Sequence, residues 1–414
     1  MNITPDRWMH YLSSVGVNFI NPYECFDPDT EVLMYDRSVR KIKDIHIGDK
    51  VLGPDGAPRT VLDECEGVDK MYRIHSGTGC DDQIVNSRHK IYYTEYNHFK
   101  KTYTDKLATP LELMKEDLHK SYIKQNRYLK RVHPTDNNVS SDLLLDPYYL
   151  GLWLGDGFTN SPAIINEDIE VIKWLSEYAE SNGMTTTLLS DKNVPIIYLK
   201  NKIYNHKNPI KDALQYYGIL SRKDIPDDYL HGSVEDKLQL MAGLIDTDGH
   251  FSKRDRIYTF SQCESRKHIV DKLAFIARSL GFKCSLHMYK TAGTKHICGN
   301  KSTCQNTYTL RIIDGLYDIP CKIARKKHHW IQKRTKRSLT NFKVSYSHIG
   351  KYKGITTDGD HFFVLKDFTV VHNCQWGIPG REGGKPATFN QITALDLTMG
   401  NVIAEYIQLM DKIE

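Results

Sequence analysis

Short runs of alternating apolar and polar residues dominate the chain between residues 25 and 95. The runs are rich in β-branched and aromatic residues and are separated by Gly, Asp and Pro: TEVLMYD, KVLGPDG, RTVLDECEG, KMYRIHS and HKIYYTE. This pattern predicts short β-strands joined by turns. Residues 345–373 return to it with KGITTDG and HFFVLKDFTVVHN. We therefore expect one β-domain whose two parts are separated by an insertion.

Helical and strand-like runs alternate from about residue 120 to residue 340, which predicts an inserted unit of mixed α/β type. The insertion contains a weak repeat, YLGLWLGDG at 149–157 and MAGLIDTDG at 241–249, with a separation of 92 residues between Asp156 and Asp248. That period favours two copies of one half-domain over a solenoid. The tail NQITALDLTMGNVIAEYIQLMDKIE has apolar residues at helical spacing, which predicts a helix outside both units.

Length and composition are those of a soluble protein of several domains, because 414 residues exceed one ordinary core and 26% of them are charged. No apolar run is long enough to cross a membrane, and the amino terminus lacks the order of a signal peptide. The nine cysteines follow no zinc spacing, the set His296, Cys298 and Cys304 included, so we expect reduced thiols and an intracellular protein. The net charge of +5 is uninformative, but residues 322–337 hold eight Lys or Arg and no acid. Such a run is either a solvated face or a phosphate-binding surface.

The two repeated motifs have the composition of closely packed helices that end in acids. Gly151 and Gly155 are four residues apart, as are Gly243 and Thr247, so small residues line one face of each helix and the backbones can approach closely. Asp156 and Asp248 then fall at the carboxyl ends, each followed by a Gly that can end the helix. Two carboxylates at one position repel each other unless a cation lies between them, and Mg²⁺ favours this donor set.

MAGLIDTDG differs at two positions from the signature of the LAGLIDADG homing endonucleases, and YLGLWLGDG resembles the usual first copy in such proteins. The resemblance implies a pseudo-twofold αββαββα pair that cuts both strands of DNA with Mg²⁺ or Mn²⁺ held by Asp156 and Asp248. SRKDIPDDYL resembles the Lys-x-Ile-Pro stretch of these enzymes and implies Lys223 as a basic catalytic residue. Its counterpart in the second half is Lys326, with Lys322 as the alternative; for both lysines, phosphate contact alone is the competing role.

Residues 25–373 resemble an intein, a protein-splicing element of the Hint fold. CFDPDTEVLMYDRSVRKIKDIHIGDKVLG resembles the amino-terminal splicing block, and YKGITTDGDHFFVLKDFTVVHNC resembles the carboxyl-terminal blocks, most closely those of the yeast vacuolar-ATPase intein group. The chemistry explains the residue types at both seams. Cys25 supplies the thiol that attacks the carbonyl of Glu24 to form a thioester, and Cys374 takes over the acyl group. The carboxamide of Asn373 then cyclises onto its own carbonyl and releases the chain.

The same blocks imply four helper residues. His89 matches the histidine that polarises or protonates the first scissile amide, and Asn86 replaces the usual Thr three residues earlier, where we expect it to bind the scissile carbonyl. His361 and His372 match the two histidines that assist asparagine cyclisation. Gly354 occupies the position where many inteins carry an aspartate, so we expect His361 to take over part of the role of that acid.

These expectations define the fold class as multidomain, an all-β Hint horseshoe interrupted by a pseudo-twofold α+β LAGLIDADG domain. The expected segments are extein fragments at 1–24 and 374–414, a splicing domain at 25–120 and 341–373, and the endonuclease at 121–340. The expected function is autocatalytic splicing, which needs no cofactor, together with site-specific cleavage of double-stranded DNA at the intein-free host allele. The partners are that DNA and the flanking exteins in cis. We expect a monomer with no membrane contact, in the cytoplasm or the nucleus.

Three alternatives compete with this interpretation. The endonuclease can have degenerated into a non-cleaving insert, although both motif aspartates are present. The chain can be a host enzyme whose work lies in the 65 flanking residues, where GIPGREGGKP has no phosphate-loop pattern. It can also be a Hedgehog-like autoprocessing domain, but that interpretation gives Asn373 and Cys374 no task.

Overall fold

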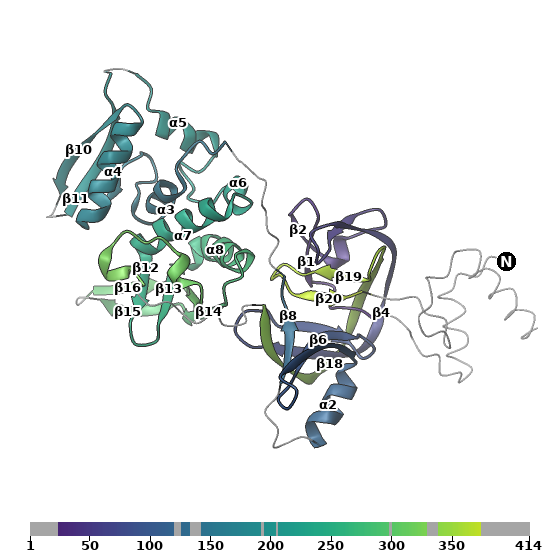
Figure 1. Cartoon of the computed structure of the whole chain (residues 1–414). Coiled ribbons are helices and arrows are strands. Elements are labelled where there is room, and N and C mark those ends of the chain that lie inside the picture. The colour runs from purple at the N-terminus through teal and green to yellow at the C-terminus, as the bar shows by residue number, and fades with distance from the viewer. Residues whose placement is uncertain are drawn as a thin grey trace, which may run out of the picture.

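The computed structural model describes residues 24–119, 126–132, 142–191, 194–203, 206–297, 300–328 and 338–373. The expected extein fragments, and with them Cys374, lie outside these ranges apart from Glu24. Two bodies are visible, a mostly β unit that also contains one helix, at Pro110–His119, and an α/β insertion (Figure 1). None of the helices in the described ranges is long and apolar enough to cross a membrane.

The mostly β body, the expected splicing unit, is built on two long antiparallel strands, β4 and β18, that pair along nearly their whole length from Phe342–Ser76 to Thr357–Val61. They belong to a seven-stranded sheet of order β3-β4-β18-β8-β6-β7, with β5 paired to β4. Two small hairpins, β1-β2 and β19-β20, complete the unit. The elements are β1 (Glu31–Leu33), β2 (Val39–Lys41), β3 (Lys50–Leu52), β4 (Pro58–Ser76), β5 (Gln83–Asn86), β6 (Ile91–Asn97), β7 (Thr102–Ala108), α2 (Pro110–His119), β8 (Arg127–Lys130), β18 (Leu339–Thr357), β19 (Phe362–Val364) and β20 (Val370–His372).

The expected boundaries of the splicing unit at residues 120 and 341 need correction. Strand β8 pairs with both β6 and β18, so the sheet continues to Lys130 and resumes at Leu339. The sequence around β8 is basic and rich in Tyr, and no pattern within it distinguishes a strand of this sheet from a strand of the insertion. The insertion is therefore shorter than expected at its amino-terminal end.

The insertion has two similar halves, as the signature implied: each has a motif helix, a short strand pairing, a second helix and further strands. The first pairing is the β12–β13 hairpin in the second half but only a single bridge, Gly157 with Ile164, in the first. Its two sheets have the orders β10-β11-β9 and β12-β13-β17-β14, and a hairpin β15-β16 projects from the second. The elements are α3 (Pro147–Asp156), β9 (Ile164–Ile165), α4 (Ile169–Ser181), β10 (Met184–Asp191), β11 (Val194–Asn201), α5 (Pro209–Tyr216), α6 (Asp227–Leu230), α7 (Val234–Asp248), β12 (Gly249–Ser252), β13 (Ile257–Cys263), α8 (Lys267–Ser279), β14 (Cys284–Lys290), β15 (Gly293–Ile297), β16 (Asn300–Cys304), β17 (Thr307–Ile312) and the 3-10 turn η4 (Ala324–Lys326).

Helices α3 and α7 cross with their backbones in contact. A Cβ atom on Gly151 would lie 2.5 Å from the carbonyl oxygen of Leu240, and one on Gly243 would lie 2.4 Å from that of Tyr148. Only glycine fits at these two positions. Asp146 and the capping box of Ser233 begin the two helices, so both run in register toward acids at their carboxyl ends.

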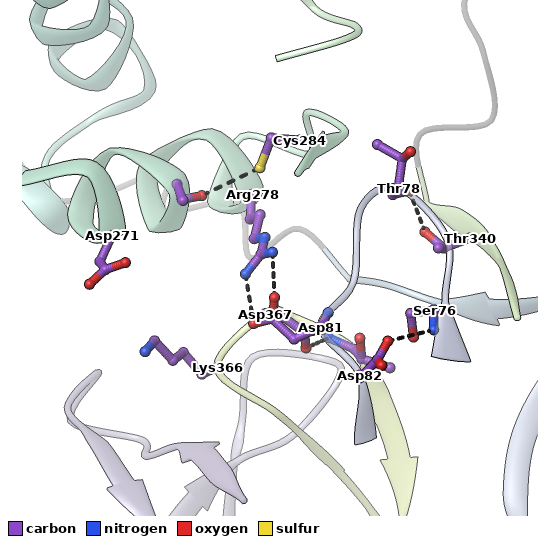
Figure 2. Close-up of polar contacts among 12 residues, drawn as sticks. Ser76, Thr78, Asp81, Asp82, Asp271, Arg278, Cys284, Thr340, Lys366 and Asp367 are labelled. Atoms are coloured by element: carbon purple, nitrogen blue, oxygen red, sulfur yellow. Dashed lines mark hydrogen bonds and ion pairs between the residues drawn. The ribbon is translucent and has the colours of Figure 1, made fainter. Parts of the chain in front are cut away.

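Each unit has its own hydrophobic core, and both an aromatic contact, Phe275 with Phe368 at 5.1 Å between ring centres, and polar contacts join the two units. The Arg278 side chain of α8 donates from both terminal nitrogens to Asp81 of the splicing unit, at 2.9 and 2.7 Å. The backbone N–H of Asp81 donates to buried Asp367 at 2.7 Å. In the other direction, Arg131 donates to the carbonyl oxygens of Phe282 and Gly281. Figure 2 shows Arg278 pointing from its helix toward Asp81 and Asp367.

We expect Gly151→Ala to destabilise the insertion by about 1–3 kcal/mol, the usual cost of overpacking, because the added methyl group forces α3 away from α7. Urea unfolding followed by circular dichroism measures this. Gly293→Ala is the matched control, since a Cβ there meets no atom within 4 Å. Equal midpoints for the two variants would show that the helix crossing tolerates a side chain.

Candidate functional site

Asp156 and Asp248 lie at the adjacent carboxyl ends of α3 and α7, as the repeat predicted. Burial and then the charge of Asp248 raise the pKa of Asp156 to about 6. Each acid is held by an amide that the sequence analysis missed: Asn166 donates to Asp156 at 3.0 Å, and Gln262 donates to Asp248 at 2.6 Å. The two amides lie after β9 and within β13 and follow their aspartates by 10 and 14 residues, so the repeat gave no signal for them.

Two buried lysines cap the same helix ends. Lys223 donates to the carbonyl oxygen of Gly155 at 3.1 Å, and burial, with the charge of Arg266, lowers its pKa to about 8. Lys326 donates to the carbonyl oxygens of Ile245, Asp246 and Thr247 at 2.8 to 2.9 Å. Burial lowers its pKa as well.

Lys322, the alternative to Lys326, has a different environment. Its Nζ lies 4.4 Å from the ring centre of Tyr148, and its backbone N–H donates to Asp246. The geometry therefore favours Lys326 as the counterpart of Lys223. Residues 329–337 of the basic run lie outside the described residues.

This arrangement suits a small hard cation that keeps part of its water shell. Within the described ranges no three His, Cys, Asp or Glu side chains lie together as a complete ligand set. Mg²⁺ is commonly bound by one or two carboxylates, with water and phosphate oxygens as the other ligands. The two acids fit that donor set, and a cation between them would offset the repulsion that contributes to the raised pKa of Asp156.

The second site lies in the splicing unit, where the two seams meet. Cys25 is fully buried, and the next residue, Phe26, exchanges backbone hydrogen bonds with Lys353 of β18 at 3.0 and 2.9 Å. A Cβ on Gly354 would lie 2.5 Å from the Cys25 sulfur and 2.9 Å from that of Cys65. The missing side chain at residue 354 therefore makes room for the thiol.

Asn86 and His89 hold the peptide bond before Cys25. The side-chain oxygen of Asn86 accepts the backbone N–H of Cys25 at 3.0 Å. This contact is on the nitrogen side of the bond, and the expected contact of Asn86 with the carbonyl stays a prediction. His89 is buried, and burial lowers its pKa to about 4 although the charge of Glu24 and a hydrogen bond to its backbone oppose the shift. The imidazole of His89 is therefore neutral near pH 7.

Asn373 and the two late histidines lie in the same place. Asn373 is fully buried; its backbone N–H donates to the His361 carbonyl at 2.8 Å, and its side-chain amide donates to the Thr357 hydroxyl at 2.6 Å. The rings of His361 and His372 are 6.4 Å apart. Sequence reasoning missed Thr357, three residues after Gly354, and also missed Glu24, whose carboxylate lies 2.7 Å from Nδ1 of His372. Cys374 lies outside the described residues.

Comparisons with known proteins match each unit separately. Residues 25–136 match the family of Hint domains associated with homing endonucleases, and residues 224–320 match the homing endonuclease family. The catalytic polypeptide of the V-type proton ATPase of Candida tropicalis is 22% identical over 84% of this chain and 43% of its own length. The homothallic switching endonuclease of Saccharomyces cerevisiae is 26% identical over 55% of this chain and 43% of its own. The chain thus spans less than half of each of these curated relatives.

Among solved structures, I-DmoI in complex with DNA and Ca matches with a TM-score of 0.28 and 16% identity, over 41% of this chain and 82% of I-DmoI.

We expect the raised pKa of Asp156 to appear in the pH dependence of stability. The folded state binds more protons than the unfolded state between about pH 4 and pH 6, so the free energy of unfolding falls as pH rises through that window. Asp156→Asn should remove this fall and stabilise the protein above pH 6 by about 1–3 kcal/mol.

Urea titrations at pH 4, 5, 6 and 7 measure this difference. Glu177→Gln is the control, because its exposed i,i+4 pair with Lys173 has little energetic weight. A constant offset between Asp156→Asn and wild type at all four pH values would contradict the assignment.

Proposed function

The chain is a Hint domain of the homing-endonuclease-associated kind that carries a homing endonuclease domain, and on this premise we propose that it excises itself by protein splicing and cleaves DNA. The observation that carries the splicing proposal is the meeting of both seams in one buried site. Glu24 and His372, 348 residues apart in sequence, lie 2.7 Å from each other there.

In the first step, the Cys25 thiol attacks the carbonyl carbon of Glu24, the C–N bond breaks, and the amide nitrogen gains a proton. Asn86 orients this nitrogen through its N–H. The neutral imidazole of His89 can accept the proton that the thiol loses and return a proton to the amide nitrogen, so the step balances. The products are a thioester at Glu24 and a free amine on Cys25.

In the later steps, the Cys374 thiol attacks the thioester and releases the Cys25 thiol. The side-chain nitrogen of Asn373 then attacks its own backbone carbonyl, and the bond to Cys374 breaks to leave a succinimide. Thr357 holds that nitrogen beforehand, and His372 is the adjacent base. The thioester finally shifts from the sulfur to the freed amine of Cys374, which joins Glu24 to Cys374 by a peptide bond.

For the inserted domain we propose metal-dependent hydrolysis of double-stranded DNA. Asp156 and Asp248 would hold Mg²⁺ or Mn²⁺, which when bound activates water and stabilises charge on the phosphate. Lys223 and Lys326 lie at the same helix ends, and a buried lysine with a pKa of about 8 can orient and deprotonate a water molecule near neutral pH. The uninterrupted host gene is the proposed target.

Both proposals place the chain in a reducing compartment, the cytoplasm or the nucleus, because Cys25 and Cys374 must remain thiols. We propose that it acts there as a monomer, since the two halves of the insertion already supply both acids. The chief competing function is a splicing element with an inactive endonuclease. The paired capping lysines and the paired amides argue against decay, because both halves retain every part.

Intact mass spectrometry of the 47.8 kDa chain, incubated at neutral pH with reductant, tests splicing. We expect a free protein of residues 25–373 and a ligated peptide made of the two flanks. Cys25→Ala should prevent ligation and leave some release of residues 374–414. Ligated product from that variant would remove Cys25 from its role.

Cleavage is tested with a plasmid that carries the uninterrupted coding sequence of the Glu24–Cys374 joint, in about 10 mM Mg²⁺ at near-physiological salt. Asp156→Asn and Asp248→Asn should each lower cleavage by about 100-fold or more, because each removes a charged metal ligand. Splicing of both variants should match wild type, since the two units have separate cores. Cleavage at wild-type rate by either variant would assign the chemistry to other residues.

A further inference from the structure

Glu24 is a buried acid that belongs to the segment being transferred rather than to the splicing element. Only 3% of the residue is exposed. Its carboxylate accepts from Nδ1 of His372 at 2.7 Å and lies 3.3 Å from Nζ of Lys90. The residue before the first scissile bond thus contacts His372, the neighbour of Asn373, whose bond to Cys374 is the last to be cleaved.

The charge of Glu24 determines how His372 is protonated. Burial alone would raise the pKa of Glu24, but its hydrogen bond with His372 and the charges of His372, His89 and Lys90 lower it overall. The carboxylate is therefore ionised near neutral pH and can only accept hydrogen bonds. Nδ1 of His372 must carry a proton, which leaves Nε2 as the nitrogen available for the reaction.

The splicing element has no room for a carboxylate of its own beside the Cys25 thiol. A side chain at Gly354 would meet the sulfur atoms of Cys25 and Cys65 at 2.5 and 2.9 Å. Asp360, near His361, forms an ion pair with Arg59 instead. In the part of the chain that the structure describes, Glu24 is the acid that pairs with His372.

We propose that Glu24 is a positioning and specificity-determining residue for asparagine cleavage. It holds the imidazole of His372 with Nδ1 protonated, so that Nε2 can take a proton from the attacking side-chain nitrogen of Asn373. An acid, an imidazole and a nucleophile in series is a general arrangement for activating a weak nucleophile. This inference rests on the proposed splicing function.

The consequence concerns the host sequence. The last residue of the amino-terminal flank is part of the substrate, but here it also completes the site that cuts the other seam. Efficient release of the carboxyl-terminal flank should therefore require an acid at position 24, and Asp should substitute better than Gln or Ala.

The test isolates asparagine cleavage in the full chain with Cys25→Ala, where Glu24 stays attached. Adding Glu24→Gln should slow release of residues 374–414 by about 10- to 100-fold, the range seen when an acid that orients a histidine is removed. Glu24→Asp should recover part of the rate. The first step is measured separately in Asn373→Ala by hydroxylamine cleavage of the thioester, and Glu24→Gln should change it by less than about threefold.

A spectroscopic measurement distinguishes orientation from packing. Nitrogen NMR of protein labelled at histidine should report Nδ1 protonation for His372 in the Cys25→Ala parent and its loss or exchange in Glu24→Gln. Glu31→Gln, which breaks an exposed pair with Lys366, is the matched control and should leave both rates and the spectrum unchanged.

The outcomes distinguish failure of the proposed splicing function from failure of the proposed role of Glu24. No release at all from the Cys25→Ala parent, together with no splicing of wild type, would defeat the splicing function. Release from the parent at a rate that Glu24→Gln does not alter would defeat the role of Glu24. Equal slowing of both steps by Glu24→Gln would assign it a packing role instead, and the inference would fail.

Discussion

The pairing of β4 with β18 is the constraint on which the rest of the molecule depends. The two strands pair residues that lie between 266 positions apart (Ser76 with Phe342) and 296 positions apart (Val61 with Thr357), and both seams are attached near one end of their ladder. Phe26 fixes Cys25 to β18 through Lys353, while Thr357, the last residue of β18, holds Asn373. The other end of the ladder adjoins β8, from which the insertion leaves. One ladder therefore assembles the splicing site near one end and supports the departure of the insertion at the other.

In the endonuclease site, by contrast, the fold loses stability because it buries two carboxylates, Asp156 and Asp248, close together. Burial of Asp156 beside another carboxylate is unfavourable, and the fold maintains it because Gly151 and Gly243 let the helix ends come together. The amides of Asn166 and Gln262 and the ammonium groups of Lys223 and Lys326 compensate only in part. A site of this kind favours whatever ligand brings positive charge.

The sequence predicted what is encoded locally or by repetition. Alternating patterns predicted the strands, and the repeat predicted the acids because each lies at a fixed place in its motif. The sequence did not predict side chains that reach their partners only in the folded structure. These are Asn166, Gln262, Thr357 and the carboxylate of Glu24. The same reason explains β8, whose membership of the sheet depends on its neighbours.

The ion pair of Arg278 with Asp81, whose backbone N–H in turn donates to Asp367, makes the splicing unit depend on the insertion (Figure 2). If the insertion were deleted, by genomic loss or by protein engineering, Asp367 and Asp81 would lose the guanidinium group and keep their mutual repulsion, which together with burial raises the pKa of Asp367. A shortened element would then need compensating changes at residues 81 and 367. The inserted domain therefore contributes to the stability of the splicing unit. Loss of its nuclease activity alone would not make the inserted domain dispensable.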